Sequence, residues 1–174
     1  MKNTISTASL LTAVAILAVA LALSSAFFAH PAEAAGDPIV VIVNNANPVD
    51  NLSLGELKKL FLSDRSRWDT GKAVAPVMLG AGAPERTSFL KIVCGMNDGD
   101  LGKYFMQAAF TGKTATPPKE VGSASAVKSF VAGSPGAIGF VKALDFHGDG
   151  SDGGVKAVKI DGIAAGSSDY KLKM

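Results

Sequence analysis

Ser134-Pro135-Gly136-Ala137-Ile138-Gly139-Phe140-Val141 is the stretch from which the architecture of this chain can be inferred: a proline–glycine turn leads directly into a short apolar run. The run does not alternate between polar and apolar residues, which predicts a strand buried on both faces. Two other runs have the same character, Pro38–Val43 and Val74–Leu79. Because segments with helical spacing separate the three runs, we expect an α/β domain with a mostly parallel central sheet flanked by helices.

Helix signals lie between these runs. Ser53 and Glu56 have the spacing of a capping box, which predicts a helix that ends near Leu62. Pro84 suits the first turn of a second helix, which should stop near Gly95. Two more helices are expected at about Asp98–Phe110 and Ser123–Val131, and Val155–Ile160 is expected to form an edge strand.

The first 34 residues are expected to be an export signal and not part of the folded domain. An apolar run follows Lys2, and the small-residue triplet Ala32-Glu33-Ala34 follows that run, which is the layout of a secretory signal peptide cut after Ala34. The run is also long enough to anchor the chain in a membrane, so retention is the alternative. We therefore expect residues 35–174 to form one domain, located in the periplasm or secreted.

Composition excludes several classes of protein. The formal net charge is only +2 and the lysines are scattered, which argues against a nucleic-acid-binding protein. Since 48% of the residues are hydrophobic, the domain can bury a core of its own. Cys94 is the only cysteine, which excludes an intramolecular disulfide and a cysteine-based zinc site. We expect Cys94 to be a buried small hydrophobe, and we expect no metal and no cofactor.

The turn between the second apolar run and the helix after it is the strongest candidate for ligand chemistry. Free backbone N–H groups at a helix start attract anions. A dinucleotide-binding fingerprint is incomplete here, because Glu85 stands where its third glycine belongs. A small oxyanion remains a candidate ligand, and ordinary polarity of a first helical turn is the alternative. The candidate oxyanion-binding residues are Gly82, Arg86, Thr87 and Ser88.

An acidic loop carries the remaining titratable residues. Asp145, Asp149 and Asp152 lack the spacing of a calcium-binding EF-hand, so we expect a solvated turn. His147, in the same loop, is expected to be exposed. A hydrolase is the third alternative, motivated only by the presence of Ser, His and Asp, and the chain has no Gly-x-Ser-x-Gly elbow to position a serine. We therefore expect no catalytic activity.

In their order along the chain, these segments resemble the substrate-binding proteins of bacterial phosphate ABC transporters. The resemblance extends over essentially all of residues 35–174, and its most specific part is the Pro135–Val141 run. The other matching segments are Pro38–Asn44, Leu54–Leu62, Trp68–Lys72, Pro76–Val77, Phe89, Ile160–Gly162 and Tyr170–Leu172.

The resemblance implies a fold and a set of partners. Members of this family have two α/β lobes of the type II periplasmic-binding-protein fold, which close over phosphate and deliver it to an ABC permease. This chain is similar to a single lobe. The resemblance therefore implies an exported solute-binding domain for phosphate or another small oxyanion, with an ABC permease or another periplasmic protein as its partner.

The oxyanion motif of that family is mostly replaced here. The family has an arginine three residues after a proline, and then Ser-Gly-Thr-Arg. Arg86 matches the last of these positions, and the other four are occupied by Leu79, Ala83, Pro84 and Glu85. A carboxylate beside the anion would repel it, which predicts weak binding. The alternative is a protein-interaction module that has lost its ligand, with an exposed patch formed by Leu79–Pro84 and Asn44–Pro48.

Overall fold

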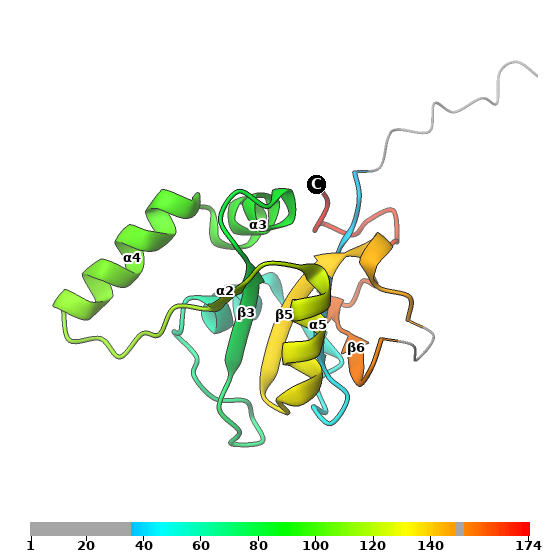
Figure 1. Ribbon diagram of the computed structural model, residues 1–174, viewed down its shortest axis with the longest axis horizontal. Helices are drawn as coiled ribbons and strands as arrows, with labels where there is room; N and C mark the ends of the chain where they lie inside the picture. Colours follow the sequence, from blue (N-terminus) through cyan, green and yellow to red (C-terminus); the bar gives the residue numbers. More distant parts are fainter. Residues whose placement is uncertain (1–35, 149–151) are drawn as a thin grey trace, which may run out of the picture. The chain divides into compact units, whose positions relative to one another are not determined.

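A five-stranded sheet lies at the centre of the part of the chain that the computed structural model describes, residues 36–148 and 152–174. The predicted export signal, residues 1–34, lies outside these residues. The strand order is β4-β3-β5-β1-β6 (Figure 1). The strands are β1 (Ile39–Asn44), β3 (Ala75–Leu79), β4 (Lys119–Val121), β5 (Ala137–Lys142) and β6 (Val155–Ala157).

The sheet is mixed in direction. β3 runs parallel to β4 and β5, whereas β1 runs antiparallel to β5 and β6. A separate parallel pair joins β2 (Asn51–Leu52) to β7 (Lys159–Ile160). The expected strand over Val155–Ile160 is therefore two short strands in different sheets: the N–H of Val158 still donates to Val41 O of β1, whereas that of Lys159 donates to Asp50 O beside β2. Because only β1 runs against the other four strands, the central sheet is mostly parallel in strand direction, as the sequence predicts.

All four expected helices are present. Ser53 and Glu56 form both hydrogen bonds of the capping box at the start of α2. Asn97 and Asp100 do the same for α4, although sequence analysis did not identify that cap. None of the helices in the described ranges is long and apolar enough to cross a membrane. The helices are α2 (Leu54–Phe61), α3 (Pro84–Phe89) with a π-helical continuation η2 (Leu90–Cys94), α4 (Asp98–Phe110), α5 (Ala124–Gly133) and a 3₁₀ turn η3 (Ala143–Asp145).

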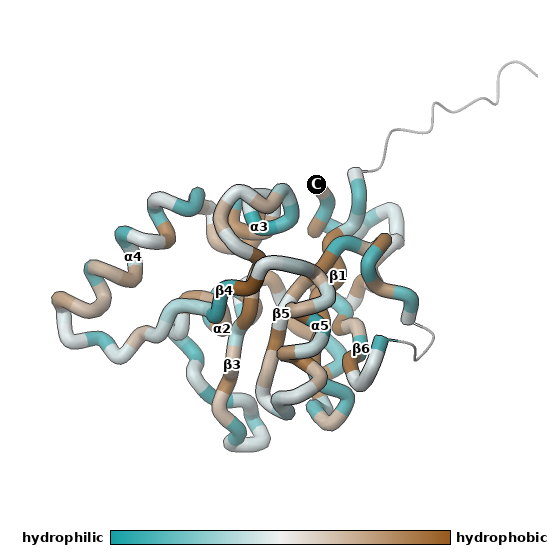
Figure 2. Tube along the Cα trace, viewed as in Figure 1, coloured by the Kyte–Doolittle hydropathy of each residue, from teal (hydrophilic) through white to brown (hydrophobic). Residues whose placement is uncertain are grey.

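The core lies on both faces of the sheet. On one face, Val127 and Val131 of α5 pack on the central strands and are fully buried. On the other, Phe61, Phe89 and Phe140 form an aromatic cluster in which the rings of Phe89 and Phe140 stack at 4.0 Å. Figure 2 shows hydrophobic residues concentrated along the central strands. All six residues of β1 are buried, as its unbroken apolar run predicts.

Two glycines of the Pro135–Val141 segment permit close packing. A Cβ on Gly136 would lie 2.0 Å from the backbone oxygen of Ala73, and the Gly136 carbonyl accepts a hydrogen bond from the indole of buried Trp68 at 2.9 Å. A Cβ on Gly139 would lie 2.7 Å from Val127 Cγ1 of α5. The glycines thus let the start of β5 approach the loop before β3, and let β5 itself approach its covering helix α5.

The first described residues pair with the last ones. Ile39 N–H donates to Leu172 O, and Met174 N–H donates to Asp37 O. The buried hydroxyl of Tyr170 donates to Ile39 O at 2.8 Å, and burial raises the pKa of that phenol well above its usual range. The C-terminal segment therefore completes the surroundings of β1.

Replacing Gly139 by alanine should destabilise the fold. The added methyl would overlap Val127 Cγ1 and lie 2.9 Å from Val77 Cγ1, and overpacking of this kind costs about 1–3 kcal/mol. Gly102→Ala is the matched control, because Gly102 lies inside α4 with open space around its Cα, and alanine there should stabilise by up to about 1 kcal/mol. Urea unfolding measures both variants; equal stabilities would contradict the close approach of α5.

Candidate functional site

Three parallel strands end at the same edge of the sheet. β3 ends at Leu79, β4 at Val121 and β5 at Lys142, and the registers place these ends side by side. In open α/β sheets, ligands bind outside the carboxyl ends of the strands. The turn from β3 into α3 lies at this edge, so the candidate residues are in the position that the fold favours for a ligand.

The start of α3 offers unpaired backbone donors. Ala83 occupies the N-cap position and its methyl cannot accept a hydrogen bond, so no side chain caps this helix. Gly82, at a φ of +88°, is exposed just before it. Thr87 is exposed, but its hydroxyl already donates to Ala83 O at 3.2 Å. Ser88 is half-buried on the same turn. Gly82, Thr87 and Ser88 therefore lie within a turn or so of the helix start.

Arg86 has a different environment from the other three candidates. Its side chain is 5% exposed, and its Nε lies 2.5 Å from Asp98 Oδ1 of α4. Its Nη1 lies 2.6 Å from Glu120 Oε1 of β4 and also donates to Leu79 O at 2.8 Å. The guanidinium is thus bound to three groups of the protein. This leaves it a structural role that sequence analysis could not recognise, because both carboxylates come from distant segments.

The carboxylate of Glu85 also has a partner. Glu85 is buried, and its Oε1 lies 3.3 Å from Lys142 Nζ at the end of β5. Together the two side chains place one negative and one positive charge at the candidate site. Sequence analysis did not select Lys142. Its position as the last residue of a strand parallel to β3 was the available signal, because such strand ends share an edge.

The two segments expected to form one exposed patch lie at opposite edges of the sheet. β1 runs antiparallel to β5, so Asn44 ends it at the edge where β3 begins. The side chain of Asn44 donates there to Val131 O and Ala132 O at the end of α5. Leu79–Pro84 lies at the other edge. The expectation of a joint patch with Asn44–Pro48 was wrong, because it assumed that β1 runs parallel to β3.

Several solved structures have this fold. A phosphate ABC transporter substrate-binding protein with bound phosphate from Clostridium perfringens matches with a TM-score of 0.59 and 24% identity, over 75% of this chain and 48% of that one. An ABC-type phosphate transport receptor from Vibrio cholerae matches with 0.57 and 23%, over 72% and 47%. PstS from Borrelia burgdorferi matches with 0.61 and 12%, over 80% and 55%. No protein-family model matches the sequence.

The fold is that of one lobe of a periplasmic phosphate-binding protein. The chain spans about half the length of these solved proteins, so the lobe accounts for one part of their architecture. Its mixed sheet with helices on both faces agrees with the fold that the sequence predicts.

The acidic loop of the lobe is organised around a buried carboxylate. Asp152, whose side chain is 2% exposed, accepts hydrogen bonds from the backbone N–H groups of His147 and Gly148 and from Lys128 Nζ at 3.0 Å. The expectation of a solvated turn was therefore wrong for this residue, while His147 is exposed as expected. Asp149 lies outside the described residues. Among the residues that are described, no cluster of His, Cys, Asp or Glu could hold a metal ion.

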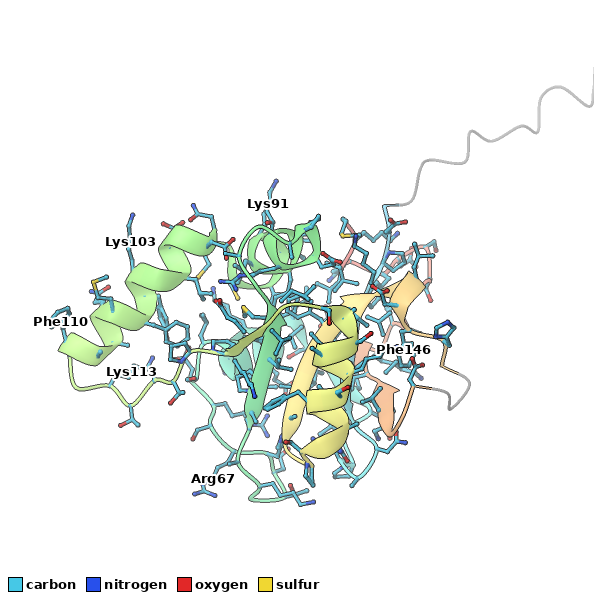
Figure 3. All side chains as sticks on the ribbon, in the orientation of Figure 1. Arg67, Lys91, Lys103, Phe110, Lys113 and Phe146 are labelled. Carbon is cyan, nitrogen blue, oxygen red and sulfur yellow. The ribbon has the colours of Figure 1, made fainter. Side chains whose placement is uncertain are left out.

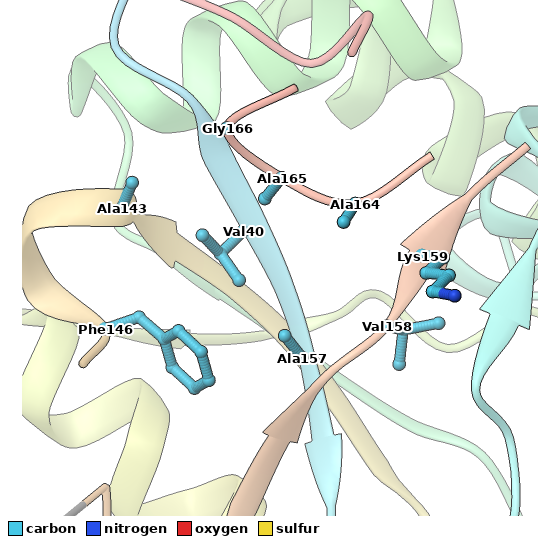
Figure 4. Close-up of a pocket in the computed structure, with 9 residues that line it drawn as sticks. All are labelled: Val40, Ala143, Phe146, Ala157, Val158, Lys159, Ala164, Ala165 and Gly166. Carbon is cyan, nitrogen blue, oxygen red and sulfur yellow. The ribbon is translucent and has the colours of Figure 1, made fainter. Parts of the chain in front are cut away.

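Neither Cys94 nor the apolar cavity beside β1 is suited to binding a polar ligand. Cys94 is buried as expected, and burial raises the pKa of its thiol to about 11, so the reactive thiolate is scarce at neutral pH. An apolar cavity of about 320 Å³ lies beside β1 and β6 and is lined by Phe146, by small apolar residues and by one lysine, Lys159 (Figure 4). It lacks the convergent polar groups that orient a polar ligand.

Removing the Arg86 side chain should mainly lower the stability of the lobe, and should change ligand affinity less. Arg86→Ala leaves the buried Leu79 carbonyl without its donor and separates α4 from β4, for an expected loss of about 2–3 kcal/mol in free energy of unfolding. The control is Arg67→Ala, since Arg67 is exposed and should cost less than about 0.5 kcal/mol. Equal denaturation midpoints for the two variants would refute the structural role.

Asp152 should make the lobe sensitive to acid. Burial raises the pKa of Asp152, but hydrogen bonds from Gly148, Lys128 and His147 outweigh this and lower the pKa to about 2, from 3.8 in an unfolded chain. The stabilisation, about 2 kcal/mol, is therefore fully present above about pH 4 and is lost as the pH falls towards 2. Asp152→Asn should lower stability at pH 7 and flatten its decline between pH 4 and pH 2. The control is Asp169→Asn at an exposed residue, which should change neither the stability at pH 7 nor its decline towards pH 2. Urea titrations at each pH measure both variants.

Proposed function

We propose that this protein is an exported, non-catalytic solute-binding domain that binds phosphate or another small oxyanion weakly, at the start of α3. The observation that carries the proposal is the uncapped first turn of α3 at the carboxyl edge of β3. Unpaired N–H groups at a helix start favour anions, and the structural neighbours include a protein with bound phosphate. The proposed ligand groups are the backbone at Gly82, the hydroxyl of Ser88 and, after rotation of its side chain, that of Thr87.

Two features argue for weak binding. Arg86 is held by Asp98, Glu120 and Leu79 O, so an anion would have to compete with two carboxylates for the guanidinium. Glu85 places a negative charge at the same turn, where effective dielectric is lower than in water and repulsion is correspondingly stronger. The Arg86 of the resembled motif is therefore proposed to act on the ligand only indirectly, by fixing the turn.

Location and partner belong to the same proposal. The predicted signal peptide and the similarity to transporter substrate-binding proteins support a periplasmic or secreted protein that works with an ABC permease or another periplasmic protein. The lobe covers about half of those proteins, so a cleft of their kind would need a second lobe opposite this one.

A protein-interaction module that has lost its ligand is the second candidate. The outer end of α4 favours it, because Met106 is 61% exposed and Phe110, one turn further on, is 86% exposed. Figure 3 shows Phe110 at that end of the helix. Exposed apolar side chains grouped in this way are typical of contact surfaces. Titration with phosphate and sulfate in a calorimeter separates the candidates, because an interaction module would give no heat with either anion.

Neutralising Glu85 should strengthen anion binding. Glu85→Gln removes the like charge and frees Lys142 for the ligand, so the Kd for inorganic phosphate is expected to fall about tenfold, equivalent to about 1.4 kcal/mol. Asp50→Asn changes the net charge equally but lies exposed before β2, where its carboxylate pairs with Lys156, and should leave the Kd unchanged. Calorimetry with folded samples of both variants decides: if Glu85→Gln and Asp50→Asn bind phosphate alike, the anion does not lie at α3.

A further inference from the structure

A second cavity lies at the opposite edge of the sheet from α3. Its volume is about 420 Å³, within the range of small-molecule sites. It opens between the segment after α2 and the loop that leads into β4, beside the first residues of β3. The lining residues are Leu60, Ser63, Arg65, Ser66, Val74, Ala75, Pro76, Thr114, Thr116, Pro117, Lys119 and Phe130.

The lining divides into an apolar part and a polar part. Leu60, Val74, Pro76 and Phe130 supply carbon surface. The polar part consists of two cationic side chains, Arg65 and Lys119, and of four residues with hydroxyl groups. None of the twelve described lining residues is acidic. A cavity of this kind can pack the carbon skeleton of a ligand while its polar groups fix an anionic group.

The ammonium of Lys119 is available to a ligand. Lys119, the first residue of β4, is exposed, and its Nζ lies 4.5 Å from the centroid of the Phe130 ring. This cation–π contact orients the side chain and leaves its N–H donors unused. Among the described residues no carboxylate lies within ion-pair distance of Lys119, in contrast to Arg86 at the other edge.

Arg65 supplies a second, positioned cation. Its Nε donates to Arg67 O at 3.0 Å, and its Nη2 lies 2.5 Å from Asp69, which is 92% exposed. Its Nη1 is 3.7 Å from Glu56, too far for a hydrogen bond. An exposed ion pair of this type contributes little stability, so an anion can replace Asp69 at small cost.

Four residues with hydroxyl groups line the same cavity as the two cations. Ser63 uses its hydroxyl to bind Thr116 O at 2.6 Å, which ties the two loops together. Ser66, Thr114 and Thr116 also line the cavity, and the hydroxyl of each can both donate and accept a hydrogen bond. Such groups match a ligand that itself carries hydroxyls.

We propose that this cavity is a binding site for a small hydroxylated organic anion, of the size and chemistry of a sugar phosphate or sugar acid. The anionic group lies between Lys119 and Arg65, the ligand hydroxyls bond to Ser66, Thr114 and Thr116, and the carbon skeleton packs on Pro76 and Phe130. The site is independent of the anion site proposed at α3, from which the length of β3 separates it.

Glucose 6-phosphate is the probe. Glucose and inorganic phosphate are the comparison ligands, because each has only part of its chemistry. Backbone amide shifts in NMR titrations locate each ligand. We expect glucose 6-phosphate to shift Ser66, Thr114 and Thr116, and to bind at least tenfold more tightly than either partial ligand. Shifts confined to Gly82, Thr87 and Ser88, or spread evenly over the exposed lysines, would overturn the proposal.

Two variants test the assignment of groups. Lys119→Gln should weaken binding of glucose 6-phosphate about tenfold, and Thr114→Val about threefold, with the thermal unfolding midpoint unchanged. Lys91→Gln is the matched control, since Lys91 is exposed on η2 at the other end of the molecule from Arg67 (Figure 3). Equal loss in Lys119→Gln and Lys91→Gln would show general charge attraction and contradict the site. Glu85→Gln should leave this affinity unchanged, which separates it from the α3 site.

Discussion

The guanidinium of Arg86 holds the candidate site in shape. One buried side chain binds the last carbonyl of β3, a carboxylate of β4 and a carboxylate of α4, so it holds groups that lie up to 34 residues from it in sequence. α4 projects from the rest of the lobe, and Asp98 fastens its first turn (Figure 1). A second cluster of Asp64, Tyr104 and Lys113 fastens its other end. The geometry of the turn before α3 therefore depends on the ion pairs of this arginine.

This use of Arg86 has a consequence for charge. In a protein that captures an anion, a buried arginine is most useful with its donors open. Here they are occupied, and the nearby Glu85–Lys142 pair leaves the edge close to neutral. At the opposite edge, Lys119 is free of carboxylate partners among the described residues and Arg65 is paired only with exposed ones. The two edges therefore differ: Arg86 and Lys142 beside the α3 turn are paired with carboxylates, whereas Lys119 at the opposite edge is not.

Sequence patterns predicted the elements well because each had a local cause. The capping box of Ser53 and Glu56, the proline at the start of α3 and the unbroken apolar run of β1 all act within a few residues. The direction of β1 and the pairing of β7 with β2 depend on contacts between distant segments, and no local pattern records them. The same holds for the site. Arg86 could be selected by spacing, but its partners Asp98 and Glu120 could not, and the burial of Asp152 was hidden in a loop of polar residues.

The position of β1 also bears on how the lobe folds. Both of its neighbours in the sheet, β5 and β6, lie about a hundred residues further along the chain, and Tyr170, which bonds to Ile39, is 131 residues away. A central strand of this kind gains no partner until most of the polypeptide is available, and closing such long loops is slow. Although β1 is synthesised before the other strands, the sheet around it should therefore form late in folding.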